Sequence, residues 1–251
     1  MNVIQALARV FFVAGVVFSG LSTNVLAQGD AAKKTTLDLK KYQYLSIVLP
    51  QSKPDGDAAR LAYYKEAFPL GSEFGLKQEM ALKVDHVIIS DYGPSGAIFY
   101  SYPNKASEVA LANHPKWPAI KAQRPKAWEQ LKIYSAEIEE DIRINFNPDK
   151  SYTLVIAWLN PENPDDYATY LESIEPMLAE AGGRFVYKMK QPAFEAHEPV
   201  GTAPGQLTFV EWDTLEGFSE LRRNDAYKAV SHYITSGTSR IEFYRLSVPE
   251  S

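Results

Sequence analysis

Two strand-like runs decide the fold of this chain, Tyr44-Leu45-Ser46-Ile47-Val48-Leu49 and Tyr152-Thr153-Leu154-Val155-Ile156-Ala157-Trp158. They begin about 108 residues apart, and each is followed by turn-forming Pro, Asp, Asn or Gly residues. Apolar residues at helical spacing come next in both places, around 57–74 and 165–181. Gly75 and Gly182 then stand where a helix ends in the left-handed conformation. The chain therefore contains an internal repeat.

The rest of each repeat follows the same order. The run Gly96–Tyr102 matches Gln206–Trp212, a second helical segment follows each, and the last strands fall at 131–138 and 240–248. A β-α-β-β-α-β order is typical of the ferredoxin-like unit, an antiparallel sheet with two helices on one face. One unit leaves its other sheet face bare. We therefore predict an α+β fold, in which two ferredoxin-like repeats pack sheet to sheet as a single-chain pseudo-dimeric barrel.

The N-terminal residues have the pattern of a secretory signal peptide. Arg9 precedes an apolar run over residues 10–18, and Val25-Leu26-Ala27 supplies a small-residue cleavage site. The apolar run is shorter than the ~20 residues that a membrane-spanning helix needs. We expect cleavage of residues 1–27, which places the mature protein in the periplasm or outside the cell. The other expected boundaries are a flexible lead-in over 28–41, a first repeat over 42–138, a linker over 139–150 and a second repeat over 151–249.

The composition argues against several classes of function. The chain has no cysteine, which excludes disulfides, iron–sulfur clusters and a thiol nucleophile. Its formal net charge is −5 and it has no basic block, which argues against nucleic acid and anionic membrane surfaces as partners. No segment after residue 27 is apolar enough to cross a bilayer, so we predict no membrane insertion. A small-molecule ligand is the partner we expect.

Four stretches of the second repeat resemble a known family. They are Asp166-Tyr167-Ala168-Thr169-Tyr170, Glu175-Pro176-Met177-Leu178, Ala181-Gly182-Gly183-Arg184-Phe185 and Arg223-Asn224-Asp225-Ala226-Tyr227-Lys228-Ala229-Val230. In them the chain resembles small bacterial dimeric α+β barrel proteins of unknown function. The resemblance implies a superfamily that includes cofactor-free monooxygenases, cyclases, isomerases, dye-type peroxidases and haem-binding enzymes. It also implies single-copy homodimers, from which this duplicated chain differs.

Two residues are candidates for catalysis, His197 and Glu211. His197 lies 111 residues after His86, close to the repeat offset, so we expect the two histidines at equivalent places near the second strand of each repeat. Each is either a general base or ligand contact, or a strand-end histidine that faces solvent or is hydrogen-bonded to a loop. Strand alternation places Glu211 on the face of the apolar Leu207 and Phe209. There it is either an acid or base with Arg184 or Arg245 as a partner, or a strand-end carboxylate that reaches water or forms a structural ion pair.

Several further residues are candidates for ligand binding. Trp158, Trp212 and Tyr227 either fill the core or line a pocket for an aromatic ligand, and His86 and Arg184 are polar candidates. His232 lies in the last helix, where the resemblance implies an axial haem ligand in some superfamily members; the alternative is an ordinary surface position. No histidine pair has the spacing of a metal site, so we predict no metal and no cofactor, with haem as the alternative.

Three functions remain open at this point. The absence of a catalytic constellation favours a periplasmic small-molecule-binding protein. The resemblance favours a cofactor-independent enzyme of the monooxygenase, isomerase or cyclase type that acts on a small aromatic or polyketide-like substrate. The third is an interaction module of a periplasmic complex, which an exposed apolar patch would indicate. Because the second repeat matches the family better, we expect the working pocket there. Association of two such barrels is left open.

Overall fold

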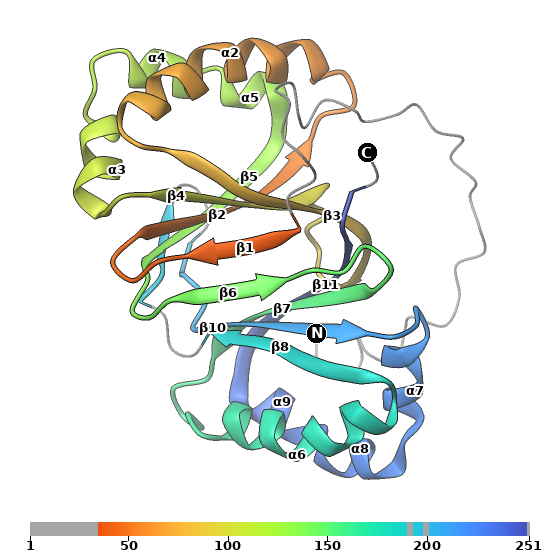
Figure 1. Cartoon of the computed structure of the whole chain (residues 1–251). Coiled ribbons are helices and arrows are strands. Elements are labelled where there is room, and N and C mark those ends of the chain that lie inside the picture. The colour runs from red at the N-terminus through yellow and green to blue at the C-terminus, as the bar shows by residue number, and fades with distance from the viewer. Residues whose placement is uncertain (1–34, 190–192, 198–200, 250–251) are drawn as a thin grey trace.

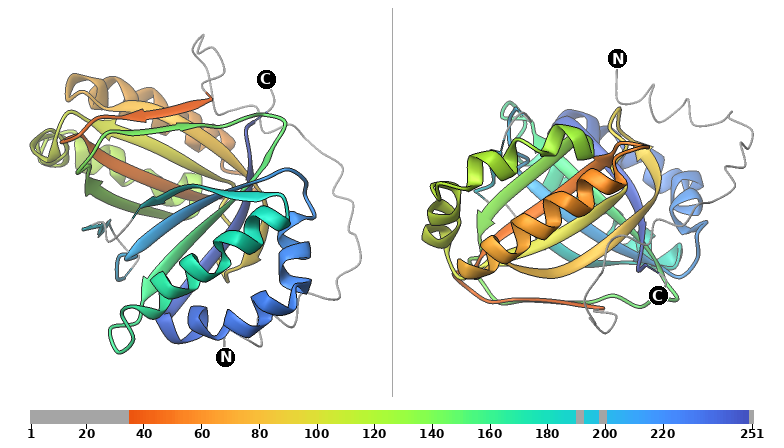
Figure 2. Two further views of the ribbon diagram at one scale, coloured as in Figure 1. Left: turned by 60° about the horizontal axis from the view of Figure 1, so that its bottom comes forward. Right: turned by 90° about the horizontal axis from the view of Figure 1, so that it is seen from above.

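The computed structural model describes residues 35–189, 193–197 and 201–249 (Figure 1). The signal peptide predicted over residues 1–27 lies outside these ranges. None of the helices described there is long and apolar enough to cross a membrane. The chain has two halves, each a layer of helices over one part of a curled sheet, as Figures 1 and 2 show.

The two halves have the same order of elements, except that the second has one more short strand, β9. The first half consists of β2 (Tyr44–Ser52), α2 (Asp57–Glu73), β3 (Lys77–Ile89), β4 (Gly96–Tyr102), α3 (Lys105–Ala112), α4 (Trp117–Lys121), α5 (Arg124–Ala127) and β5 (Trp128–Glu137). The second half consists of β7 (Ser151–Leu159), α6 (Asp166–Glu180), β8 (Gly183–Met189), β9 (Glu195–His197), β10 (Gln206–Trp212), α7 (Gly217–Arg223), α8 (Asp225–Val230), α9 (His232–Gly237) and β11 (Thr238–Ser247). The predicted α+β class is therefore confirmed.

Local sequence explains where the helices end. Gly75 and Gly182 follow α2 and α6 with φ of 79° and 69°, the left-handed conformation predicted for both. Each second helical segment is split into three short helices rather than forming the single helix that was predicted. In the first half, Pro118 and Pro125 lie in the first turns of α4 and α5, where a proline is tolerated but a continuing helix is interrupted.

The described strands form a sheet in the order β8-β10-β7-β11-β3-β4-β2-β5-β9, with antiparallel pairing between neighbours. The first half contributes β3-β4-β2-β5, and the second half contributes β8-β10-β7-β11 in the corresponding order. β11 pairs with β3, and β5 pairs with β9. The sheet is strongly curled (Figure 2), and its two end strands, β8 and β9, follow one another in the chain. We call the space that it encloses the barrel interior.

The strand registers correct the sequence alignment by one residue. Tyr44 lies opposite Tyr102, whereas Ser151 lies opposite Trp212, so the counterpart of Tyr44 is Ser151 and not Tyr152. Tyr44 accordingly packs under the helices of the first half, while Tyr152 packs in the barrel interior. A slip of one residue moves a side chain to the opposite face of a sheet, which is why the sequence match alone was misleading.

Three clusters of buried residues hold the fold together. The largest fills the barrel interior, and the other two lie under α2–α5 and under α6–α9. The lead-in and linker contribute to the largest one, because β1 (Thr36–Leu39) pairs with β6 (Ile142–Asn145) and buries Leu37, Leu39, Ile142 and Ile144. This differs from the flexible lead-in predicted over 28–41. The alternation of leucine with polar residues in β1 gives it an apolar face for the barrel.

Candidate functional site

The candidate site is a cavity of about 170 Å³ between the sheet and the helices of the first half. The matching space in the second half is about 30 Å³, roughly the share of one water molecule in the liquid. The larger of these two spaces is therefore in the first half, whereas the working pocket was expected in the second. The family resemblance of the second half rests on residues that form its helices and strands. Such residues do not determine whether side chains fill the space between the helices and the sheet.

Aromatic side chains form much of the cavity wall. Tyr63 and Tyr64 come from α2, Tyr100 and Tyr102 from β4, and Trp128 from the start of β5. Alternation along β4 directs Tyr100 and Tyr102 to the same face of the sheet, toward the helices. The rings of Tyr63 and Trp128 meet edge to face, with centroids 5.1 Å apart. These contacts give the cavity a wall of packed rings.

Tyrosine hydroxyls give this wall its polar character. Burial raises the pKa of Tyr64 to about 12 and raises the pKa of Tyr100 well above its usual value. Both hydroxyls therefore stay protonated at neutral pH and can donate a hydrogen bond. The hydroxyl of Tyr100 makes no hydrogen bond to any residue that the structure describes, although Tyr100 is buried. It is available to a bound molecule.

Charged residues lie where the cavity meets a neighbouring open cleft. Lys121 and Arg124 line both spaces. The Nε atom of Arg124 donates a hydrogen bond to the hydroxyl of Tyr63 at 3.1 Å, and its guanidinium lies 5.5 Å from the ring centroid of Trp117. Glu108 of α3 also lines the cavity. The site thus combines aromatic surface with two cations and one carboxylate.

The predicted residue His197 lines this same cavity. Although it belongs to the second half, β9 places it opposite Ile133 of β5, on the wall of the first-half cavity. Its Nε2 atom is buried and has no hydrogen-bond partner among the described residues. Glu195 fixes the other end of β9, since it accepts a hydrogen bond from the Tyr44 hydroxyl at 3.3 Å and pairs with Lys105. The bond from Lys105 lowers the pKa of Glu195.

The second catalytic candidate, Glu211, is held by an ion pair and a hydrogen bond within the second half. Its carboxylate pairs with the Arg184 guanidinium at 2.9 Å and accepts a hydrogen bond from the Tyr152 hydroxyl at 2.7 Å. Neither Glu211 nor Arg184 lines the first-half cavity, so the structure does not bring them to His197. Of the alternatives left open by the sequence, these contacts match the structural ion pair.

The remaining histidines do not line the cavity. His86 is exposed and lies opposite Arg245 of β11. It is not the counterpart of His197, because Ile89 lies opposite Phe243 as His197 lies opposite Ile133. A bulge between the paired residues of β3 and β11 shifts this register. The expected equivalence of the two histidines is therefore wrong.

His232 does not fit the role of a haem ligand. Its ring is exposed, its Nδ1 atom lies 2.9 Å from the carbonyl oxygen of Ala229, and its ring centroid lies 4.0 Å from that of Tyr233. The cavity beneath α6–α9 is far too small for a porphyrin, at about 30 Å³. No group of three metal-binding side chains is found among the described residues either.

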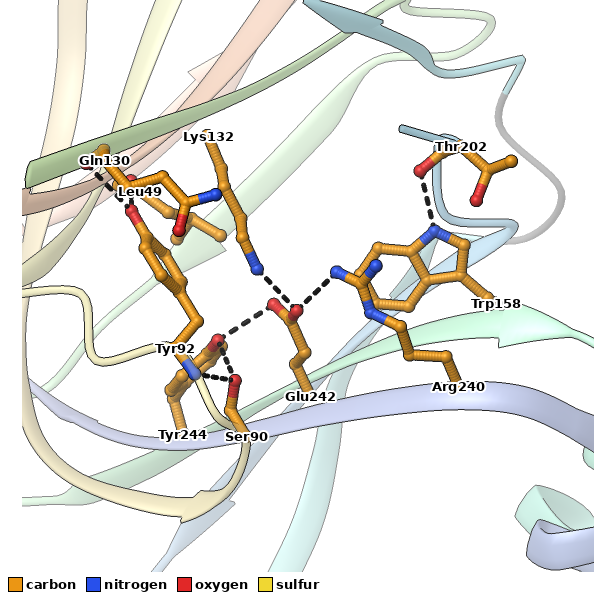
Figure 3. A network of polar contacts seen from close by, with 10 residues as sticks. All are labelled: Leu49, Ser90, Tyr92, Gln130, Lys132, Trp158, Thr202, Arg240, Glu242 and Tyr244. Carbon is orange, nitrogen blue, oxygen red and sulfur yellow. Dashed lines mark hydrogen bonds and ion pairs between the residues drawn. The ribbon is translucent and has the colours of Figure 1, made fainter. Parts of the chain in front are cut away.

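The three aromatic candidates of the second half belong to its core. Trp212 donates from Nε1 to the hydroxyl of Thr153 at 2.9 Å, and the hydroxyl of Tyr227 lies 3.2 Å from that of Tyr170. Trp158 lies in the barrel interior, where its Nε1 donates to the carbonyl oxygen of Thr202 at 2.8 Å (Figure 3). Their polar atoms are thus already satisfied by the protein.

Sequence reasoning missed the tyrosines of the first-half cavity. The alternation of Ile98, Tyr100 and Tyr102 along one strand was a usable signal for a shared face. That signal does not separate a cavity wall from a packed core, because both need the same periodicity. The cations Lys121 and Arg124 carried no signal, since they come from two short helices that were not predicted.

Comparison with known proteins supports the fold. A family described as a domain of unknown function (DUF1330) matches residues 152–242, less than half of the chain. The structure is similar to that of an anthrone oxidase-like protein, with a TM-score of 0.51 and 11% identity over 86% of this chain and 97% of the other. No curated protein sequence matches the chain.

Other solved structures are less similar. A monooxygenase-like protein from Lactobacillus acidophilus has a TM-score of 0.40, with 10% identity over 82% of this chain and 93% of the other. A chlorite dismutase variant from Candidatus Nitrospira defluvii has a TM-score of 0.47, with 9% identity over 83% and 93%. The DUF1330 match covers part of the second half, and the anthrone oxidase-like protein shares the fold of the chain. They do not assign an activity, because this fold carries many.

Proposed function

We propose that the chain is a small-molecule-binding α+β barrel protein whose binding site is the cavity of the first half. The observation that carries this proposal is the Nε2 atom of His197, which is buried at the cavity wall without a partner. Buried polar atoms in proteins are normally hydrogen-bonded. A ligand that supplies the missing bond accounts for a histidine in this place.

The lining indicates the chemical class of the ligand. Tyrosine and tryptophan rings favour a flat aromatic molecule, which they contact through faces and edges. The guanidinium of Arg124 at the junction with the open cleft favours an acidic substituent at that end. His197 and Tyr100, which also line the cavity, favour a hydroxyl or carbonyl group on the ligand. We therefore propose a small aromatic ligand with acidic or phenolic groups.

We also propose that the two halves arose by tandem duplication and form a single-chain pseudo-dimer. The matching strand order of the halves supports this proposal. So does a β-bulge at the same place in each half, between Gln78 and Met80 and between Phe185 and Tyr187. The pseudo-dimer supplies His197 from one half to the cavity of the other, which explains why both halves are needed for one site.

A cofactor-independent enzyme is the second candidate, and it rests on the same histidine. A neutral Nε2 atom can accept the proton of a phenolic O–H group, which leaves a phenolate in the cavity and an imidazolium on His197. A purely binding protein, in contrast, holds its ligand with no transfer of the proton.

We propose further that the protein is exported and works in the periplasm or outside the cell. The pattern of Arg9, the apolar run after it and Val25-Leu26-Ala27 supports this proposal. Mass spectrometry of the protein from the periplasmic fraction should find an N-terminus at Gln28. Full-length protein confined to the cytoplasm would contradict it.

Binding of nitrophenol tests the proposed site, because its absorption band moves to longer wavelength on deprotonation. Wild type should bind the probe, and His197→Gln should weaken binding by about 10- to 100-fold, since a buried hydrogen bond is lost. His86→Gln is the matched control and should bind as wild type does. Equal affinity in all three proteins would contradict the site. Below the probe's own pKa, nitrophenolate absorption in the complex would favour the enzyme, and neutral absorption the binding protein.

A further inference from the structure

An ion pair buried in the barrel interior joins the two halves. The Nζ atom of Lys132 lies 2.6 Å from Oε1 of Glu242, and the exposed fractions of the two side chains are 7% and 4% (Figure 3). Glu242 also accepts hydrogen bonds from the Tyr244 hydroxyl at 2.8 Å and from Arg240 at 2.5 Å. The ammonium of Lys132 lies 4.0 Å from the ring centroid of Tyr92. Burial lowers the pKa of Lys132, and Glu242 opposes that shift.

The two partners occupy equivalent positions in their halves. Lys132 is the fifth residue of β5 and Glu242 is the fifth residue of β11, the last strand of each half. Lys132 lies opposite Leu49 and Glu242 opposite Ile156, and each of these is the sixth residue of the first strand of its half. A contact between equivalent positions lies on the approximate twofold axis that relates the halves.

Pairing of two identical halves would bring each of these residues against its own copy. Two first halves would place two Lys132 ammonium groups together, and two second halves would place two Glu242 carboxylates together. Like charges buried in contact are strongly unfavourable, because neither desolvation nor repulsion is compensated. Opposite charges with added hydrogen bonds avoid this cost.

We infer that this ion pair makes each half pair with the other half of the chain and disfavours pairing with an identical half. The inference rests on the pseudo-dimeric arrangement proposed above, but not on any ligand. Pairing of two first halves should be less favourable than pairing of two second halves. In the first half the neighbour of Lys132 is the Tyr92 ring, which attracts a cation without neutralising its charge. In the second half Arg240 partly neutralises Glu242.

Charge reversal in the full chain tests the pair. Lys132→Glu and Glu242→Lys should each lower the folding equilibrium constant by about two to three orders of magnitude, as expected for a broken buried pair. The double variant K132E/E242K should recover part of that loss, because it restores opposite charges but places a cation beside Arg240 and a carboxylate beside the Tyr92 ring. Glu137→Lys, at an exposed position on β5, is the control and should unfold as wild type does. Stable single variants, or a double variant less stable than either single one, would overturn the inference.

Refolding the two single variants together tests the choice of partner. Within each single variant the chain's own halves bring like charges together. In an equal mixture of K132E and E242K, exchange of halves between the two chains brings opposite charges together in both barrels. Native mass spectrometry should therefore show a one-to-one complex of the two variants, which neither forms alone. Recovery of separate monomers alone from the mixture would overturn the inference.

Discussion

The two helix-covered faces of the sheet share one architecture and differ in what fills them. The first encloses a cavity of about 170 Å³, and the second leaves about 30 Å³. Glu108 lines the first, and Phe218 takes the corresponding place in the second, each three residues before a buried leucine. The Phe218 ring packs on Phe243 with centroids 4.5 Å apart. One large side chain thus fills the space that the first half leaves open.

The first half also has polar groups at positions where the second half has apolar side chains. Tyr100 and Val210 are each the fifth residue of their strand, and the hydroxyl is present only where the cavity is. His197 corresponds to Ile89, which lines the small apolar space of the second half. The comparison teaches that a few substitutions on a shared scaffold decide between a binding site and a packed core.

The largest expected effect is a loss of stability when the Phe218 ring is removed from the second half. Phe218→Ala should cost about 3 kcal/mol of the free energy of unfolding, because it leaves an unfilled space between packed rings. Glu108→Ala should change it by less than about 0.5 kcal/mol, since that side chain fills no gap. Denaturant titration of both variants measures the difference. Equal losses would show that the halves are packed alike, against the comparison.

A large side chain placed in the first-half cavity should abolish most of the ligand binding there. Glu108→Phe transfers the residue type of the second half into the first and should weaken nitrophenol binding by about tenfold or more, or ~1.4 kcal/mol. Val109→Phe places the same ring at an exposed neighbouring position and is the control. The account fails here if Glu108→Phe binds as wild type does.

Removing a tyrosine hydroxyl should have opposite consequences in the two halves. Tyr170→Phe loses the bond to the Tyr227 hydroxyl and should cost about 1 kcal/mol of the free energy of unfolding. Tyr100→Phe removes a hydroxyl with no described partner, so the free protein should be as stable as wild type or slightly more so. Thermal or chemical unfolding of the pair is the measurement. A larger loss for Tyr100→Phe would indicate that the protein itself satisfies this hydroxyl.

The smallest expected effect is a change of stability that appears only at alkaline pH. Burial raises the pKa of Tyr64 to about 12 from the 10.0 of a free tyrosine, so the folded protein holds this proton more tightly than the unfolded chain. That contribution to stability is complete below about pH 10 and is lost as the pH rises toward 12. Tyr64→Phe should therefore lose less stability than wild type between these pH values. Parallel curves for the two proteins would contradict the burial of this hydroxyl.

Much of the fold was predictable from the sequence, because the hydrophobic period reports which residues face a core. The strand order and the glycines after α2 and α6 follow from such local patterns. The register did not, since a strand match shifted by one residue still looks apolar, as with Tyr44 and Tyr152. The bulge in β3 misled the pairing of His86 with His197 in a similar way.

The site was less predictable than the fold. His197 was found from its residue type, although its place on the first half's cavity depends on pairing between β9 and β5, which local sequence does not encode. Glu211 was found to be buried among apolar residues, but its partners Arg184 and Tyr152 could be fixed only by the strand registers. Whether rings fill a space or surround one depends on the whole set of side chains.

A crystal structure of the protein with bromophenol would test the central claim most directly, because the anomalous signal of bromine locates the ring without bias. The account predicts a bromine peak in the first-half cavity, with the phenolic oxygen within hydrogen-bond distance of Nε2 of His197. A peak beneath α6–α9, or peaks only on the outer surface, would contradict it.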